Sequence, residues 1–429
     1  MIRLTPLCRA LLLCALCSAA PLTAQDTTRG VRIGLTYDPG TKPGVIVLPS
    51  RGTGADSIRA IVQRDLDYGD RVSVIALDAA SADQISRGTN SWPILAKLGA
   101  AASVQVTPTA TGFHLAVYDV TKQVTALVRD YPAPQMTELR AWRAALHGLS
   151  DDLEESLTGT RGIAHSRIAF QRDRRLWVVD SDGEQATMVT GDAEPLSVAW
   201  NSTGTSLTYN TLIPSSIVVR DIQAGRSRVI ASGNGVFASP IFSPDGASVI
   251  FAHGVDDGVD IYSAPAEGGS MRRLSVGRGS DNVSPTFSPD GRRIAFTSAR
   301  AGHPEIYTMD ADGTNAEPLT PLAFGENPHR ADPDWSPLGQ TVAFTSSVSG
   351  VFQVMTISLR DRSMKQLTSE GRNEGPSWAA DGRHIVFSSD RSGTKQLWVL
   401  DVESNRARQL TRTGRQNRNA AWSPRLNPN

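Results

Sequence analysis

The apolar positions of this chain follow two different patterns, one before about residue 160 and one from residue 167 onward. In the first part, apolar runs typical of strands lie between stretches whose apolar residues recur every three or four positions, as on a helix face. In the second part, short apolar runs alternate with turn residues at nearly regular intervals. The sequence therefore predicts a mixed module followed by an all-β module.

Residues 37–160 are predicted to form a small α+β domain. Val45-Ile46-Val47-Leu48 is an unbroken apolar run, typical of a strand covered on both faces. Ile58, Ile61, Val62 and Leu66 share one helix face, and Gly69 lies just past the end of that helix. Ser91 can cap a short helix with Pro93 in its first turn. We expect further strands at 72–76, 103–107, 113–118 and 124–128, and a last helix with an apolar stripe from Leu139 to Leu157.

The second part of the chain, residues 167–424, repeats one phrase that an aromatic residue opens. The phrase is clearest as Phe287-Ser288-Pro289-Asp290-Gly291. Each repeat continues with two strands, exemplified by 293–297 and 305–309, then a hairpin turn and a short edge strand. A period of about 40 to 50 residues is typical of a β-propeller blade. The anchors are Trp200, Phe242, Phe287, Trp335, Trp378 and Trp422.

The two ends of this repeat array complement each other. The strand Arg167-Ile168-Ala169-Phe170 has no anchor phrase before it, and Trp422-Ser423-Pro424 has no blade after it. Joined, they make one complete blade and leave no open sheet edge. The predicted fold is therefore an all-β six-bladed propeller of four-stranded blades, closed by the C-terminal strand and preceded by the α+β domain.

The N-terminal residues predict export. Arg3 and Arg9 precede a short apolar run and then small residues, which is the layout of a cleaved signal peptide over 1–24. All three cysteines lie in this segment, so the mature chain is expected to lack disulfides. With 43 basic and 43 acidic residues and no long run of one sign, the chain predicts no nucleic-acid binding and no direct membrane attachment. We expect an exported protein that is a monomer.

Motifs for catalysis or metal binding are missing from the sequence. It contains neither a Gly-x-Ser-x-Gly nucleophile elbow nor His-Glu-x-x-His, and its seven histidines fall at different phases of the repeat. Asp310–Asn315 resembles the start of a calcium loop, but its glycine comes early and no glutamate closes it. We therefore predict no catalytic residue, no metal site and no cofactor.

The segments just before each anchor are the candidate binding site. They are polar and variable, whereas the blade frame is uniform, and each leads into an innermost strand at one mouth of the central channel. The predicted rim residues are Phe237, Ser239, Asp281, Asn282, Val283, Ser284, Asn327, His329, Arg330, Asp332, Asn373, Glu374, Arg418 and Asn419.

These features resemble the TolB family, the periplasmic propeller proteins of the Tol-Pal system. The resemblance rests on Gly44–Pro49, Val104–Pro108, the helix end Glu155–Gly159 before Arg167–Phe170, and the terminal Trp422–Leu426. It implies a scaffold, not an enzyme, whose rim binds the lipoprotein Pal and whose mature N-terminal segment binds TolA, in support of outer-membrane integrity and invagination at cell division. Transferred by position, the TolA segment spans residues 25–36 and includes Asp26, Arg29, Val31, Arg32 and Ile33.

Two alternatives stay open at this stage. An exported propeller could instead bind other peptides or glycans. A hydrolase or lyase is also conceivable, but a prolyl-peptidase-like enzyme needs roughly 250 further residues with a Ser-His-Asp triad.

Overall fold

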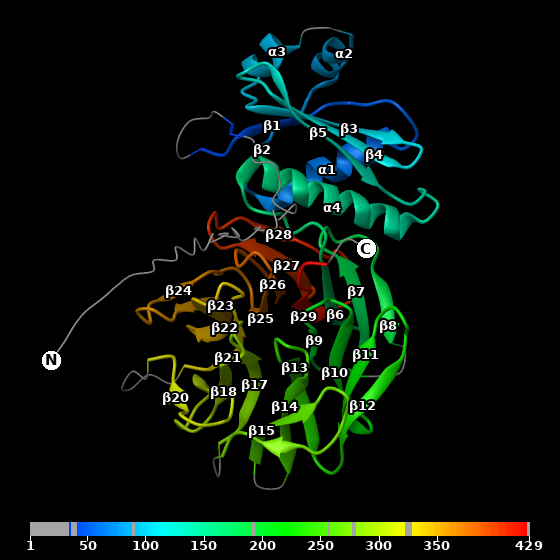
Figure 1. The fold of residues 1–429 in the computed structure, drawn as a ribbon. Coiled ribbons are helices and arrows are strands. Elements are labelled where there is room, and N and C mark those ends of the chain that lie inside the picture. Colours follow the sequence, from blue (N-terminus) through cyan, green and yellow to red (C-terminus); the bar gives the residue numbers. More distant parts are fainter. Residues whose placement is uncertain are drawn as a thin grey trace, which may run out of the picture.

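A computed structural model describes residues 34–35, 41–87, 91–190, 194–255, 258–276, 280–321 and 328–426. The predicted N-terminal segment lies outside the described residues except for Gly34 and Leu35. Figure 1 shows the α+β part at one end of the molecule and the strands from β6 onward at the other.

A five-stranded sheet forms the first part, in the order β2-β1-β3-β4-β5. Strand β1 pairs in parallel with β2 and β3, whereas β3, β4 and β5 form antiparallel hairpins. The elements are β1 (Gly44–Val47), α1 (Ala55–Gly69), β2 (Ser73–Val74), α2 (Ala79–Arg87), α3 (Trp92–Lys97), β3 (Ala102–Thr109), β4 (Gly112–Asp119), β5 (Val124–Pro132) and α4 (Leu139–Thr158).

Helices cover both faces of this sheet. Leu66 of α1 and Leu149 of α4 are fully buried in one apolar core with Val104 of β3. On the other face, Ile46 packs in a second cluster with Ile85 of α2 and Leu95 of α3. This two-sided burial explains why the first strand is an unbroken apolar run.

Two details of this part differ from the sequence-based expectations. Helix α2 was not predicted. Ser91 precedes α3, with Pro93 at its start as expected, but its hydroxyl makes no capping bond and donates to the carbonyl of Ile85 at 3.4 Å. Ser91 therefore ties α3 to the end of α2 and leaves the helix uncapped by a side chain.

Six four-stranded sheets follow, which confirms the propeller prediction. We number them in chain order as blades 1 to 6. Blade 1 contains β29 (Asn417–Trp422), β6 (Arg167–Arg172), β7 (Arg175–Asp180) and β8 (Thr187–Thr190). Blade 2 contains β9 (Val198–Trp200), β10 (Ser206–Leu212), β11 (Ser215–Asp221) and β12 (Ser227–Ser232), and blade 3 contains β13 (Val236–Phe242), β14 (Ser248–Val255), β15 (Gly258–Pro265) and β16 (Arg272–Arg273).

The remaining three blades repeat the same order from the channel outward. Blade 4 contains β17 (Asn282–Phe287), β18 (Arg293–Ser298), β19 (Glu305–Asp310) and β20 (Glu317–Pro318). Blade 5 contains β21 (Arg330–Trp335), β22 (Thr341–Val348), β23 (Val351–Ser358) and β24 (Met364–Gln366). Blade 6 contains β25 (Asn373–Trp378), β26 (His384–Ser389), β27 (Gln396–Asp401) and β28 (Ala407–Gln409).

The C-terminal strand closes the ring. Strand β29 pairs antiparallel with β6, so that Trp422 lies opposite Ile168. The Trp422 indole is buried and donates a hydrogen bond to Ser166 Oγ at 2.8 Å. Closure thus follows the route expected from the two unmatched ends of the repeat.

The anchor phrase forms a tight turn. In blade 4, Asp290 accepts bonds from Ser288 Oγ at 2.6 Å and from the backbone N–H of Arg292 at 3.1 Å, which lowers the pKa of the carboxyl group. Gly291 follows with a φ of 71°, a value that glycine adopts without steric cost. These carboxylates therefore serve the turns, as their regular recurrence indicated.

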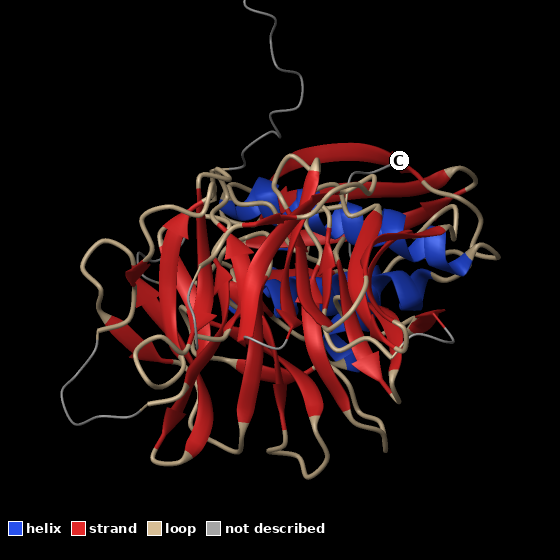
Figure 2. Ribbon diagram, turned by 90° about the horizontal axis from the view of Figure 1, so that it is seen from below, coloured by secondary structure: helices blue, strands red, loops and turns tan. Residues whose placement is uncertain are grey.

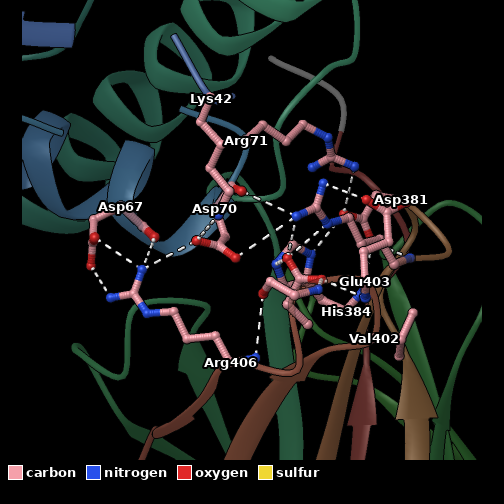
Figure 3. A network of polar contacts seen from close by, with 12 residues as sticks. Lys42, Asp67, Asp70, Arg71, Asp381, His384, Val402, Glu403 and Arg406 are labelled. Carbon is pink, nitrogen blue, oxygen red and sulfur yellow. Dashed lines mark hydrogen bonds and ion pairs between the residues drawn. The ribbon is translucent and has the colours of Figure 1, made fainter. Parts of the chain in front are cut away.

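The α+β part sits on blades 6 and 1, at the ends of the blades where the anchor turns lie. Arg71 bridges Asp381 Oδ2 at 3.1 Å and Glu154 Oε1 at 3.3 Å, and Arg406 reaches back to Asp67 at 2.7 Å (Figure 3). In Figure 2, seen from below, the helices lie behind the propeller strands. The predicted rim, at the opposite ends of the inner strands, is therefore left open.

Candidate protein-binding rim

Six inner strands line a central cavity of about 760 Å³. Its lining includes residues of β9, β13, β17, β21, β25 and β29, together with side chains at the mouth such as His329, Phe352 and Glu374. The lining also includes Ser202, Pro337 and Pro424 at the anchor turns, so the cavity extends along the central channel from the rim to those turns.

A left-handed backbone residue stands three positions before five of the six anchors. Ser239, Ser284, Asp332, Gly375 and Asn419 have φ values of 49°, 49°, 52°, 59° and 54°. At each of them the pairing with the next strand shifts register, which marks a β-bulge. Four of the five are not glycine, so each stores roughly 1 to 3 kcal/mol of backbone strain. The bulges form a ring around the channel, and clustered strain of this kind is typical of functional surfaces.

Polar contacts link this ring from blade to blade. Ser239 N–H donates to Ser197 Oγ at 2.9 Å, and Ser284 Oγ donates to Asp332 Oδ1 at 3.0 Å. The amide of Asn419 donates to the carbonyl of Leu196. These bonds therefore link blade 1 to blade 2, blade 2 to blade 3, and blade 4 to blade 5 at the rim.

Asp332 is the acidic group of this ring. Its side chain is exposed to the channel. The channel walls surround it, however, and the resulting loss of solvation raises the pKa of its carboxyl group. The hydrogen bond from Ser284 lowers the pKa, and the negative charge of Glu374 raises it. Asp332 is thus an ionisable acceptor whose charge a cationic or hydrogen-bonding partner would stabilise.

Glu374 shows the opposite shift at the mouth of the channel. Burial alone would raise its pKa, but Lys395 and Arg372 pair with the carboxylate and lower it. The Arg372 guanidinium also stacks on the Phe352 ring, 4.1 Å from its centroid. His329 packs against the same ring, with centroids 5.2 Å apart. Blades 5 and 6 therefore present an ordered aromatic and charged cluster to solvent.

Four predicted rim residues are buried and hold the blades together. Phe237 stacks on His253, with ring centroids 4.1 Å apart. Asn282 donates to Asp260 Oδ1 at 2.9 Å, Arg330 to Glu305 Oε2 at 3.0 Å, and Asn373 to Gln353 Oε1 at 2.8 Å. All four stand five positions before their anchors and are at most 6% exposed. The sequence-based site needs correction here, because these side chains cannot touch a partner at the rim.

The other predicted rim residues are at least partly accessible. Asp281, His329, Asp332 and Arg418 are exposed. Ser239, Val283, Ser284, Glu374 and Asn419 are partly exposed. Asn327 lies outside the described residues, as do the N-terminal residues Asp26, Arg29, Val31, Arg32 and Ile33.

Sequence reasoning missed Asp334, which lies one position before its anchor. Its carboxylate accepts the backbone N–H of Trp378, in the next blade, at 2.7 Å. Burial raises its pKa to about 6, although this hydrogen bond lowers it. Thr286 and Ser377, at the same repeat position, bond in the same way to Trp335 and Trp422. Aligning the repeats position by position, instead of by segment, would have revealed this set.

Asp65, His147 and Asp182 form the one group of described residues close enough to share a metal ion. They lie under the α+β part, where burial lowers and the Asp65 carboxylate raises the pKa of His147, with a net rise. Both Arg64 and Arg143 already pair with Asp182 Oδ2. Two guanidinium groups beside the carboxylate oppose a further cation, so this cluster fits an interdomain ion-pair network.

No described helix combines the length and the apolar composition that crossing a membrane requires. Fold and site together define a six-bladed β-propeller with an open channel mouth and an α+β domain docked on the opposite face. The TolB beta propeller domain model matches residues 154–329 and 323–427. The chain belongs to this TolB family.

Individual relatives agree with this assignment. The crystal structure of TolB from Acinetobacter baumannii superposes with a TM-score of 0.74 at 25% identity, over 92% of this chain and 100% of that one. The Tol-Pal system protein TolB of Polaromonas naphthalenivorans is 30% identical over 218 residues, 47% of this chain and 48% of the relative. That of Polaromonas sp. JS666 is 31% identical over 233 residues, 50% and 51% of the two chains. The chain thus spans about half the length of the curated relatives it matches.

Proposed function

We propose that this protein is a non-enzymatic periplasmic scaffold of the Tol-Pal system that binds a Pal-like lipoprotein through its rim. The observation that carries this proposal is the ring of left-handed bulges around an open central channel of about 760 Å³. The name that the curated relatives carry, Tol-Pal system protein TolB, supports a partner within that system. In this role the protein supports outer-membrane integrity and invagination at division, attached to the membrane only through its partners.

The chemistry of the channel favours binding over catalysis. Ser284 Oγ donates to Asp332, and the His329 ring packs against Phe352 at a tilt of 54°. Among the described residues of the lining, no hydrogen bond joins a serine to a histidine as a hydrolase requires. Accessible polar and aromatic groups of this kind suit contact with a protein ligand.

The test is direct binding of the mature protein to the purified soluble domain of the Pal-like lipoprotein from the same organism, measured by calorimetry. We expect saturable one-to-one binding that D332N weakens. Absence of binding, together with failure to recover the lipoprotein from envelope extract, would contradict the proposal.

A second contact, to a TolA-like inner-membrane protein through residues 25–36, completes the proposed scaffold. Within this segment, the structure describes Gly34 and Leu35. Lys122 Nζ donates to the Gly34 carbonyl at 2.6 Å, and Leu35 packs against the core of the α+β domain. Deleting residues 25–33 should abolish TolA binding and leave lipoprotein binding intact. Equal TolA binding by the deletion variant would move this contact elsewhere.

A further inference from the structure

Blades 2 and 3 carry exposed apolar side chains at their rim ends, which we call the apolar arc. Ile213 is 87% exposed, Val276 78%, Val236 55%, Val255 51% and Leu196 41%. Two contacts bring parts of the arc together. The Phe237 N–H donates to Ser215 Oγ at 3.0 Å, beside the turn that holds Ile213, and Val236 pairs with Gly254, next to Val255. Large apolar residues gathered on one surface mark a contact site more often than scattered ones do.

Blades 6 and 1 carry a different surface at the same rim, which we call the basic crescent. It consists of Arg172, Arg174, Arg372, Arg391, Lys395, Arg412, Arg415 and Arg418. Contacts connect its parts. The Asn417 N–H donates to the Lys395 carbonyl at 2.8 Å, Arg172 Nε donates to Asn417 Oδ1 at 2.7 Å, and Arg415 lies 3.6 Å from Asp173.

The crescent has more basic than acidic groups. Its acidic neighbours are Asp173, Glu194, Glu370, Glu374 and Asp390. Asp173 pairs with Arg415, and Glu194 pairs with Arg174. Glu374 is shared between Arg372 and Lys395. Arg412 and Arg418 are exposed and have no acidic partner within the described part of the chain. The crescent therefore leaves positive charge for an outside ligand.

We propose that the rim recognises a protein whose contact face has two parts, an acidic patch against the basic crescent and an apolar patch against the apolar arc. This inference rests on the proposed function and specifies the partner surface. Charge complementarity argues for the acidic patch, and exposed apolar area for the apolar one.

A protein fits this surface better than an anionic membrane does. The arc contains aliphatic residues only, whereas membrane-surface proteins place aromatic residues at the lipid boundary. Next to the crescent lies the exposed acidic residue Glu370, which a uniformly anionic bilayer would repel and a discrete protein surface can match. The hollow channel mouth between the two parts would accommodate a protruding partner loop.

Two sets of variants test the inference in the full mature chain. The crescent set is R412S, R415S and R418S together, and the arc set is I213S, V236S and V276S together. The matched controls are R226S with R360S, and L338S, which alter exposed residues at the opposite ends of their blades. Thermal melting checks that every variant folds.

Binding kinetics to the purified Pal-like lipoprotein are measured from low to physiological salt. The crescent set should slow association about tenfold at low salt and flatten its salt dependence, because charge steers the encounter. The arc set should speed dissociation about tenfold with unchanged salt dependence, because most effects of contact loss fall on dissociation. The controls should stay within about twofold of the wild type.

The outcomes separate the two proposals. If the wild type binds the lipoprotein but neither set alters the kinetics, the two-part surface is wrong and the proposed function stands. If the wild type does not bind, both fall. If both sets instead abolish binding to vesicles of phosphatidylcholine with phosphatidylglycerol and leave lipoprotein binding unchanged, the surface serves a membrane and the inference is overturned.

Discussion

The two faces of this propeller use charge in opposite ways. On the face that carries the α+β domain, the carboxylates are enclosed and paired: the side chains of Asp381, Asp182 and Glu154 are 0%, 1% and 3% exposed. On the rim, Asp332, Arg412 and Arg418 are open to solvent. One repeated four-stranded unit therefore supports both a sealed contact within the chain and a surface available to a partner.

The difference arises from the two ends of each blade. The anchor turns of blades 3, 4 and 6 carry an aspartate at the same position. Asp381 of blade 6 pairs with Arg71 of the α+β domain, whereas Asp245 and Asp290 are exposed. The rim segments vary in length and chemistry, while their bulges keep the backbone in one conformation. Variation thus accumulates at the end of the ring that remains free.

The largest effect should come from opening the ring, since both faces depend on its closure. A chain that ends at Ala420 lacks Trp422, whose loss alone should cost about 3 to 5 kcal/mol. We expect a sharp fall in the thermal midpoint, or no folding, in calorimetry. A chain that ends at Leu426 is the control. An unchanged midpoint in the shorter chain would show that closure contributes little.

Breaking the sealed face should come next. R71A leaves the buried carboxylate of Asp381 without this cation, which should lower the free energy of unfolding by about 3 kcal/mol. R406A removes a pair whose side chains are 48% and 41% exposed, so its effect should be below about 1 kcal/mol. Urea unfolding measures both. Equal costs would remove the distinction between buried and exposed pairs.

The sealed face should also respond to pH. Burial raises the pKa of Glu154 to about 8, although Arg71 lowers it. The Glu154 carboxyl group therefore binds its proton more tightly in the folded protein than in the unfolded chain. This difference stabilises the fold fully below about pH 4.5, and the stabilisation is lost as pH rises toward 8. Relative to E154Q, the wild type should lose at most about 1.4 kcal/mol per pH unit across that window.

Urea unfolding of both proteins between pH 4.5 and pH 8 measures this difference. Glu155, a neighbouring glutamate that is half-buried, provides the control variant E155Q. A constant difference between wild type and E154Q across the window would mean that Glu154 stays ionised beside Arg71.

The smallest effect on stability should come from D332N on the rim. Because burial within the channel raises the pKa of Asp332, its charge does not stabilise the fold at neutral pH, and the amide can still accept the bond from Ser284. We expect that the thermal midpoint does not fall by more than about 2 °C, and that lipoprotein binding weakens. A large destabilisation would make Asp332 a structural residue.

The blade architecture could be predicted because its cause lies within each repeat. The turn Ser288–Gly291 and the apolar strands on either side fix a blade locally, and the unmatched strands at 167–170 and Trp422 fix the closure. The α+β domain was predictable from apolar periodicity, except for α2. Helix α2 is short and lies between loops, and the packing of Ile85 against Ile46 of the sheet stabilises it.

The binding site was only partly predictable. The segments were found, but whether a side chain faces the channel or the neighbouring blade depends on the bulge. Asn282 and Ser284 are two residues apart, yet the first is buried against Asp260 and the second lines the channel. The contacts of Arg71 with Asp381 join residues 310 apart and leave no local signal in the sequence.

Amide hydrogen exchange of the mature protein, with and without the purified Pal-like lipoprotein, tests the central claim most directly. We predict that the lipoprotein slows exchange in the rim segments 236–239, 328–332, 372–375 and 411–419, and leaves the docked face around Arg71 and Asp381 unchanged. Protection confined to the docked face or to the α+β domain would contradict the assignment of the open rim as the binding surface.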